Sequence, residues 1–107
     1  ETDSTSVSVK HTIQIPQLFT ISNYPNPFNP ITTINFSLTQ DTYLNIVIHD
    51  IMGKQIKQIV NGNKIAGQNL VQWDGTNYKG ETVSAGVYFY SVEAEGYLET
   101  KKMILLK

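Results

Sequence analysis

The chain has 107 residues, with eight Lys, no Arg, nine acidic residues and a formal net charge of −1. This length accommodates one domain with a single hydrophobic core. The absence of Arg argues against recognition of nucleic acid or phosphate, which relies heavily on the guanidinium group. There are no cysteines, which excludes disulfides, thiolate catalysis and Cys-ligated zinc.

The sequence shows no transmembrane segment and no export signal. No apolar run approaches the roughly 20 residues that cross a bilayer. The N-terminus has neither an initiator Met nor the basic and apolar segments of a signal peptide. We therefore expect the chain to be a piece of a longer protein.

Residues 1–17 differ in composition from the rest of the chain. Ser4, Thr5, Ser6 and Ser8 give the segment a composition typical of a linker. Apolar residues at odd positions from Val7 to Ile15 alternate with polar ones, as in a strand. This segment is predicted to be a linker or the end of an upstream domain, and the alternative is an added edge strand. The domain itself is predicted to span residues 18–107.

From residue 18 onward the pattern is that of strands only. The alternation predicts strands at residues 33–38, 43–50, 54–60, 68–73, 87–94 and 98–106. A long loop is expected at residues 74–80 and a tight connection at residues 95–97. No window shows the three- and four-residue spacing of an amphipathic helix. We therefore predict an all-β fold, an Ig-like or fibronectin-like β-sandwich of about seven antiparallel strands.

A hairpin turn is predicted at Asp50–Lys54. Asp50 can accept hydrogen bonds from the N–H groups of a turn, and Gly53 stands where a type I turn closes through a left-handed residue. Residues 43–50 and 54–60 would form the hairpin, and Asn61-Gly62 would end its second strand.

The predicted core consists of apolar residues on the inward face of these strands. Along residues 43–49, Leu44, Ile46 and Ile48 alternate with residues that face solvent. The core is predicted to contain Ile34, Phe36, Leu38, Leu44, Ile46, Ile48, Ile56, Val71, Trp73, Val83, Tyr88, Tyr90, Val92, Met103 and Leu105.

Three prolines stiffen the segment that leads into residue 33. Pro25, Pro27 and Pro30 restrict the backbone and disfavour a helix before them, which predicts a rigid corner. A surface read by a receptor is a second, compatible interpretation. Tyr24 and Phe28 would then be partly exposed anchors, and Asn26 and Asn29 would supply polar contacts.

No arrangement of side chains indicates catalysis or a metal site. Ser84 lies outside the Gly-x-Ser-x-Gly pattern of hydrolase nucleophiles. Residues 74–77 offer Asp and Asn oxygens but lack the spacing of a calcium loop, so a turn capped by Asp74 is predicted. His11 and His49 have no partner at ligand spacing and are predicted to face solvent. We expect no enzyme activity, no cofactor and no metal.

The last predicted strand combines lysines with apolar residues. Lys101 and Lys102 precede Met103–Leu106, and Lys107 ends the sequence. Lysines on an edge strand prevent pairing between sheets, which accounts for the charges. If Lys107 is the natural terminus, a receptor for the C-terminus meets this strand first.

Four fragments together resemble a known family. Asn23–Pro30, Asp50–Lys54, Gly86–Tyr90 and Lys101–Lys107 resemble, in order and spacing, the type A C-terminal sorting domain of type IX (Por) secretion cargo. The resemblance covers about residues 18–107. The predicted recognition residues are Tyr24, Pro25, Asn26, Pro27, Phe28, Asp50, Gly53, Lys54, Gly86, Tyr88, Lys101, Lys102 and Lys107.

This resemblance implies a sorting module at the C-terminus of a larger exported cargo protein of a Gram-negative bacterium. Its partners would be the attached cargo and the type IX machinery, namely an outer-membrane translocon, a shuttle and a sortase-like protease. The protease would remove the domain at the cell surface, within about residues 1–20, and the cargo would be released or joined to a surface polysaccharide. Trp73-Asp74-Gly75 followed by Gly86-Val87-Tyr88 also resembles the Ig-like domain of flagellar hook-capping proteins.

Two other functions remain open. A carbohydrate-binding module would need exposed aromatic residues in a row. The candidates are Tyr43, Tyr78, Phe89 and Tyr97, which fall on separate predicted elements. A passive Ig-like spacer of an adhesin or surface enzyme would need no recognition residues at all.

Overall fold

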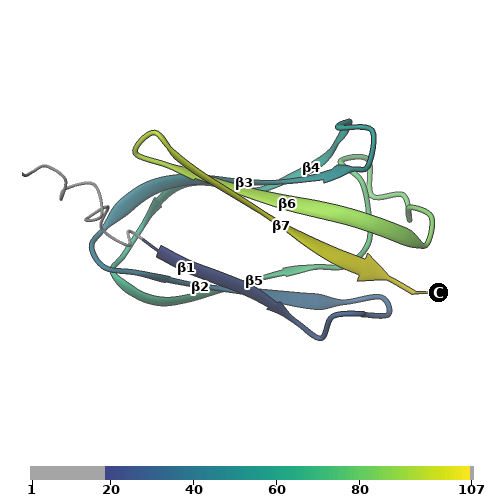
Figure 1. Cartoon of the computed structure of the whole chain (residues 1–107), viewed down its shortest axis with the longest axis horizontal. Coiled ribbons are helices and arrows are strands. Elements are labelled where there is room, and N and C mark those ends of the chain that lie inside the picture. Colours follow the sequence, from purple (N-terminus) through teal and green to yellow (C-terminus); the bar gives the residue numbers. More distant parts are fainter. Residues whose placement is uncertain (1–18, 107) are drawn as a thin grey trace, which may run out of the picture.

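The computed structural model describes residues 19–106, which form a sandwich of two β-sheets (Figure 1). This part of the chain contains seven antiparallel strands and no helix, which confirms the predicted all-β, Ig-like architecture. The strands are β1 (Phe19–Tyr24), β2 (Thr32–Leu38), β3 (Thr42–Asp50), β4 (Gln55–Lys64), β5 (Gly67–Trp73), β6 (Gly86–Ala94) and β7 (Tyr97–Leu105). Residues 1–18 and Lys107, and the expectations for them, lie outside the described residues.

The two layers differ in size and in charge. One sheet has the strand order β1-β2-β5 and the other has the order β4-β3-β6-β7. The strands of the three-stranded sheet contain no charged side chain.

Residues 19–106 include no helix that could cross a membrane.

The core lies between the sheets and follows the predicted alternation. Leu44, Ile46 and Ile48 of β3 are buried, and the residues between them lie on the outer face of the sheet. Val71 and Val83 are the only predicted core residues that are not fully buried. Val71 lies on edge strand β5 and Val83 in the connection after it, so both pack at the rim of the core. Buried hydrophobic residues that the prediction missed are Phe19, Ile21, Phe28, Val60 and Ala94.

The predicted hairpin is present, but its second strand is longer than expected. Asp50 Oδ1 accepts hydrogen bonds from the N–H groups of Met52 and Lys54, each at 2.9 Å, and Gly53 has a φ of 85°. The prediction that Asn61-Gly62 ends the strand is wrong, because β4 stays paired with β3 as far as Lys64. A bulge between the pairs of Ile46 and Val47 lets β4 follow the twist of β3 over this length.

Because the strands are antiparallel, the connections gather at two ends of the sandwich. The residues 25–31, 51–54 and 74–85 lie at one end, together with the last residues of β7 (Figure 1). We call this the β7 end. The connections 39–41, 65–66 and 95–96 lie at the opposite end.

Candidate functional site

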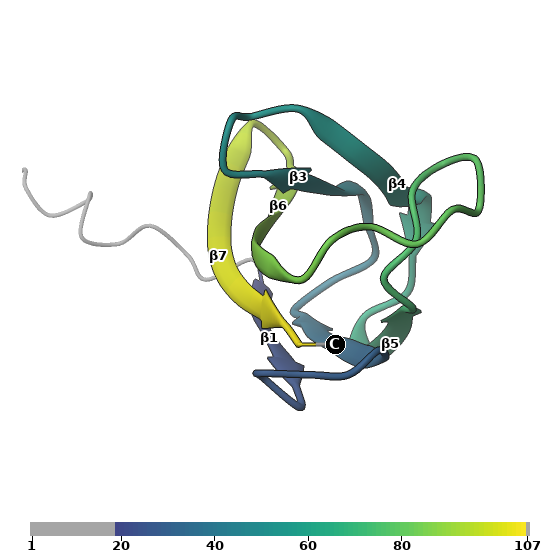
Figure 2. The ribbon, with the colours of Figure 1, turned by 90° about the vertical axis from the view of Figure 1, so that its right-hand side faces the viewer.

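Within residues 19–106, the four fragments that resemble the sorting domain come together at the β7 end. The proline segment, which we define as residues 25–30, follows β1, and Asp50–Lys54 closes the turn between β3 and β4. Gly86 begins β6, and β7 ends beside it through the pair of Gly86 with Leu105. Figure 2, which looks at this end, shows the last residues of β7 between the proline segment and the connection 74–85. The sequence alone did not predict this proximity.

The proline segment is bonded directly to β7. Asn26 Oδ1 accepts a hydrogen bond from the N–H of Ile104 at 3.0 Å, and Asn26 Nδ2 donates to the carbonyl of Lys102 at 3.3 Å. The N–H of Phe28 donates to the carbonyl of Ile104 at 2.9 Å, and the N–H of Leu106 donates to the carbonyl of Phe28 at 2.8 Å. Phe28 and Leu105 thereby form a short parallel bridge. The first and last fragments of the pattern are thus one structural unit.

These bonds cover an edge of the four-stranded sheet. An edge strand exposes unpaired N–H and C=O groups to which another strand can pair. The proline segment occupies such groups at residues 102 and 104 of β7 and at Leu106, the residue that follows it. On the other edge, the N–H of Tyr78 donates to the carbonyl of Ile56 in β4 at 3.0 Å. Both edges of this sheet are therefore partly covered at the β7 end.

Phe28 is not the partly exposed anchor that the sequence predicted. Its side chain is 1% exposed, and its ring centroid lies 5.7 Å from that of Trp73. The backbone bridge to β7 turns the ring inward, where it closes the space between the two sheets. Tyr24 has the opposite environment, with 81% of its surface exposed on the outer side of β1.

The corner between β1 and β2 is held by a network that the prediction missed. Asn23 Nδ2 donates to Thr32 Oγ1 at 3.0 Å, and the Thr32 hydroxyl donates to the carbonyl of Pro25 at 2.8 Å. Tyr90 of β6 donates its hydroxyl to Asn23 Oδ1 at 3.1 Å. Burial, and secondarily the charge of Glu99, raises the pKa of Tyr90 to about 12. The peptide bonds that precede Pro25, Pro27 and Pro30 in this corner are cis.

Aromatic residues fill the interior beneath this corner. The ring centroid of Trp73 lies 5.3 Å from that of Tyr88, and the indole N–H donates to the carbonyl of Thr76 at 2.8 Å. The Tyr88 hydroxyl donates to the carbonyl of Ser84 at 2.7 Å. Burial and then the charge of Asp50 raise the pKa of Tyr88. Tyr88 therefore supports the site from inside and does not lie on its surface.

The connection 74–85 is built from polar caps. The Thr76 hydroxyl bonds to Asp74 at 2.5 Å and, with the nearby charge of Lys57, lowers the pKa of Asp74 against the opposing effect of burial. Asn77 Oδ1 accepts from the N–H groups of Lys79 and Glu81. Within residues 19–106 no three acidic or His side chains are grouped as metal ligands.

The surface of the β7 end combines exposed apolar side chains with lysines. Met52, at the tip of the β3–β4 turn, is 84% exposed. The exposed apolar side chains here are Tyr24, Ile31, Ile51, Met52, Tyr78 and Leu106. Lys54, Lys101 and Lys102 are also exposed, and Lys101 lies 3.8 Å from Glu99.

His49 lies on the outer face of β3, one residue before Asp50, and lines a pocket together with Ile51 and Gly53 of the turn. Its ring stacks on Phe89 with centroids 5.8 Å apart, and its Nε2 lies 2.8 Å from the Ser91 hydroxyl. The prediction placed His49 on the correct face, but the ring is partly buried and not free in solvent. His11 lies outside the described residues.

The comparisons identify the domain type. The family model of the FlgD Ig-like domain matches residues 30–97. No curated protein matches the chain. Among solved structures, latent PorU from Porphyromonas gingivalis aligns with a TM-score of 0.66 and 21% identity over 82% of this chain and 9% of PorU. PorZ from the same organism, a surface component of the type IX secretion system, aligns with a TM-score of 0.59 and 21% identity over 81% of this chain and 11% of PorZ.

A flagellar protein has the same fold. FlgD from P. aeruginosa aligns with a TM-score of 0.56 and 16% identity over 81% of this chain and 72% of FlgD. At these identities the likeness to the solved structures concerns the fold. The chain spans about a tenth of the length of PorU and PorZ. Since the family model covers more than half of its residues, the chain belongs to the FlgD Ig-like domain family.

Proposed function

We propose that this domain is a sorting module that directs a larger, covalently attached cargo protein through the type IX secretion system. The observation that carries the proposal is the pairing of the proline segment with the end of β7 through Asn26 and Phe28. It joins the first and last fragments of the sorting pattern into one surface that a receptor could read. The shared fold of PorU and PorZ supports the same assignment.

In this proposal the domain is an address and has no catalytic role. The cargo would be exported behind a separate N-terminal signal, and the domain would fold in the periplasm. The outer-membrane machinery would then bind the β7 end. A protease of the system would cut near residues 1–20 and leave the cargo on the cell surface or outside the cell.

Several of the predicted recognition residues fall into two groups according to their environment. Phe28, Asp50, Gly86 and Tyr88 are structural, because each is buried or occupied in a turn or strand pair. Tyr24, Lys54, Lys101 and Lys102 are exposed and available to a partner. Ile31, Met52 and Leu106 join them as exposed apolar contacts that the sequence pattern did not single out.

An export assay tests the proposal. The full chain is fused behind a signal peptide and a reporter in a host with type IX machinery, and in a strain that lacks the translocon. We expect the reporter outside the first strain and in the periplasm of the second. A reporter that stays in the periplasm of the first strain would refute the sorting function.

Surface variants locate the recognition site. One triple variant changes three exposed residues of the β7 end to Ser, namely Tyr24, Ile31 and Leu106. The matched control changes three residues that are exposed elsewhere to Ser, namely Ile65, Leu70 and Leu98. Exposed substitutions change stability by less than ~0.5 kcal/mol each. We expect only the first triple variant to lose export. Equal export by both would place recognition on another surface.

Membership of the FlgD Ig-like domain family favours a second candidate, a passive spacer. A spacer works at any position in a chain, whereas a C-terminal sorting module does not. Placing the domain before the reporter instead of after it should abolish export if it is a sorting module. Both arrangements should behave alike if it is a spacer.

A further inference from the structure

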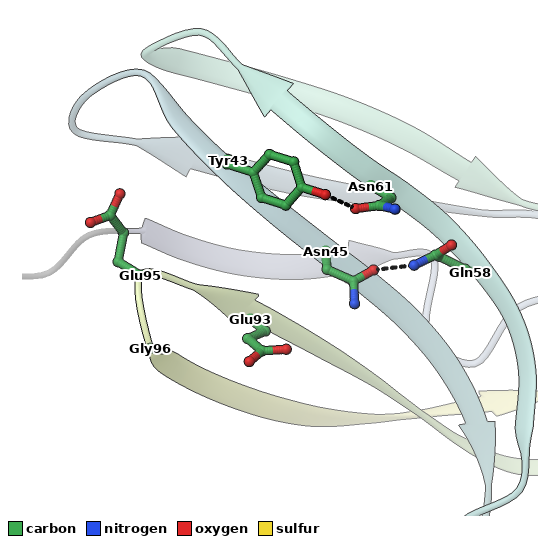
Figure 3. A pocket seen from close by; sticks show the side chains of 7 residues that line it. All are labelled: Tyr43, Asn45, Gln58, Asn61, Glu93, Glu95 and Gly96. Atoms are coloured by element: carbon green, nitrogen blue, oxygen red, sulfur yellow. Dashed lines mark hydrogen bonds between the residues drawn. The ribbon is translucent and has the colours of Figure 1, made fainter.

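A polar pocket of about 350 Å³ lies on the outer face of the four-stranded sheet, near the end opposite to the β7 end. Its lining residues come from β3, β4 and β6 and from the turn after β6 (Figure 3). They include Tyr43, Asn45, Gln58, Asn61, Glu93 and Glu95. Among the described residues, no Lys or other cationic side chain lines this pocket.

The strand register produces this arrangement. Asn45 of β3 lies opposite Asn61 of β4 on one side and opposite Glu93 of β6 on the other. Neighbouring strands are about 4.8 Å apart, so the three side chains form a row across the sheet. The row contains two amides followed by a carboxylate, and Glu95 adds a second carboxylate from the turn.

Internal hydrogen bonds orient the two amides. Gln58 Nε2 donates to Asn45 Oδ1 at 2.7 Å. The Tyr43 hydroxyl donates a hydrogen bond to Asn61 Oδ1. Within residues 19–106, the amide oxygens of Asn45 and Asn61 therefore each have an internal donor, and their amide nitrogens are left for a ligand. Figure 3 shows the Asn45 nitrogen on the side of the side chain that faces Glu93.

This combination of donors and acceptors selects the chemistry of the ligand. Two carboxylates disfavour an anion. A hard cation prefers oxygen ligands, and here the amides present N–H groups to it instead. A hydroxyl group can accept from an amide N–H and donate to a neighbouring carboxylate at the same time. Adjacent hydroxyls of a sugar satisfy the row of Asn61, Asn45 and Glu93 without introducing charge.

We propose that this pocket binds a neutral saccharide. Tyr43 is 54% exposed and offers an aromatic surface beside the polar row. The site is independent of the sorting function, because it uses the outer face of the sheet and the opposite end of the sandwich. Sugar binding would let the domain touch a glycan while its β7 end is engaged.

A nuclear magnetic resonance titration tests the site directly. The ¹⁵N-labelled full chain is titrated separately with cellohexaose, xylohexaose, laminarihexaose, mannohexaose and calcium chloride. We expect at least one hexasaccharide to give saturable shifts of the Asn45 and Asn61 side-chain amides and of the Glu93 backbone amide. Calcium chloride should leave these signals in place.

A single substitution removes the amide N–H of Asn45, the proposed donor to the saccharide, and keeps the other lining side chains. Asn45→Asp retains the oxygen that accepts from Gln58 but loses the outward N–H, and should weaken saccharide binding by about tenfold or more. Asn35→Asp is the matched control. Gln68 Nε2 donates to Asn35 Oδ1 at 3.2 Å, so the control alters an equivalent amide pair on the other sheet with the same change of charge.

Several outcomes would overturn the proposal. One is the absence of shifts at these amides with all four hexasaccharides. Others are equal binding by Asn45→Asp and Asn35→Asp, or shifts caused by calcium chloride alone. If Asn45→Asp melts at a lower temperature than the control, Glu93→Gln replaces it, since this change keeps the shape and removes the charged acceptor. Unchanged binding by Glu93→Gln would also count against the site.

Discussion

Asn26 Oδ1 accepts a hydrogen bond at 3.0 Å from the backbone N–H of Ile104, a residue 78 positions further along the chain. The same side chain donates to the carbonyl of Lys102. One amide group thus replaces a neighbouring strand over part of the edge of β7. This relationship joins an Asn between two prolines and the last residues of β7 into one structural unit.

Changing Asn26 to Asp should destabilise the domain. The carboxylate keeps the acceptor for Ile104, but it loses the donor and places negative charge near the Lys102 carbonyl. We expect a loss of about 1–2 kcal/mol in the free energy of unfolding, measured by urea denaturation. Amide hydrogen exchange should accelerate at Ile104 and Leu106. Asn29→Asp, an exposed control in the same segment, should change stability by less than ~0.5 kcal/mol.

Phe28 and Tyr24 should respond in opposite ways to truncation. Phe28→Ala removes a buried ring that contacts Trp73, and should cost about 3–5 kcal/mol. Tyr24→Ala removes an exposed ring and should cost less than ~0.5 kcal/mol. Chemical denaturation measures both. Similar losses in the two variants would contradict the inward position of Phe28.

The β3–β4 turn contains both a structural residue, Asp50, and exposed residues such as Met52. Asp50→Ala deletes the acceptor of two backbone N–H groups and should cost about 1–2 kcal/mol. Met52→Ser, which changes a side chain at the tip, should leave the melting temperature nearly unchanged. A variant Asp50→Asn keeps an acceptor oxygen and should recover most of the loss. If it melts like Asp50→Ala, the hydrogen bonds of the turn are not the cause.

Alkaline pH should weaken the domain through Tyr90. Its pKa is raised to about 12 in the folded state, above the ordinary value of 10.0, so the folded state holds the proton more tightly than the unfolded chain. The resulting contribution to stability is complete below pH 10 and is lost as the pH rises from about 10 to about 12. Denaturation at a series of pH values should show this fall. Tyr90→Phe should flatten it and cost about 1 kcal/mol at neutral pH, because the bond to Asn23 is lost. A fall of the same steepness in Tyr90→Phe would show that another group causes it.

The sequence was sufficient to predict six of the seven strands because their information is local, whereas β1 (Phe19–Tyr24) was not among the predicted strands. Alternating residues such as Leu44, Ile46 and Ile48 specify a face, and Asp50 with Gly53 specifies a turn, from residues only a few positions apart. The predicted end of β4 was wrong because it, too, was inferred from local sequence alone. Asn61-Gly62 reads locally as a turn, but pairing with β3 keeps the strand extended as far as Lys64.

The environments of individual residues at the β7 end were decided by the tertiary structure. Tyr24 and Phe28 look equivalent in the sequence, yet one is exposed and the other is buried, because hydrogen bonds to β7 orient the backbone at Phe28. The row of Asn61, Asn45 and Glu93 likewise depends on the register of three strands. The sequence by itself determined the fold class, most of the core and the order of the motif fragments. Which fragments touch, and which side chains face solvent, depended on contacts between distant residues that local patterns do not encode.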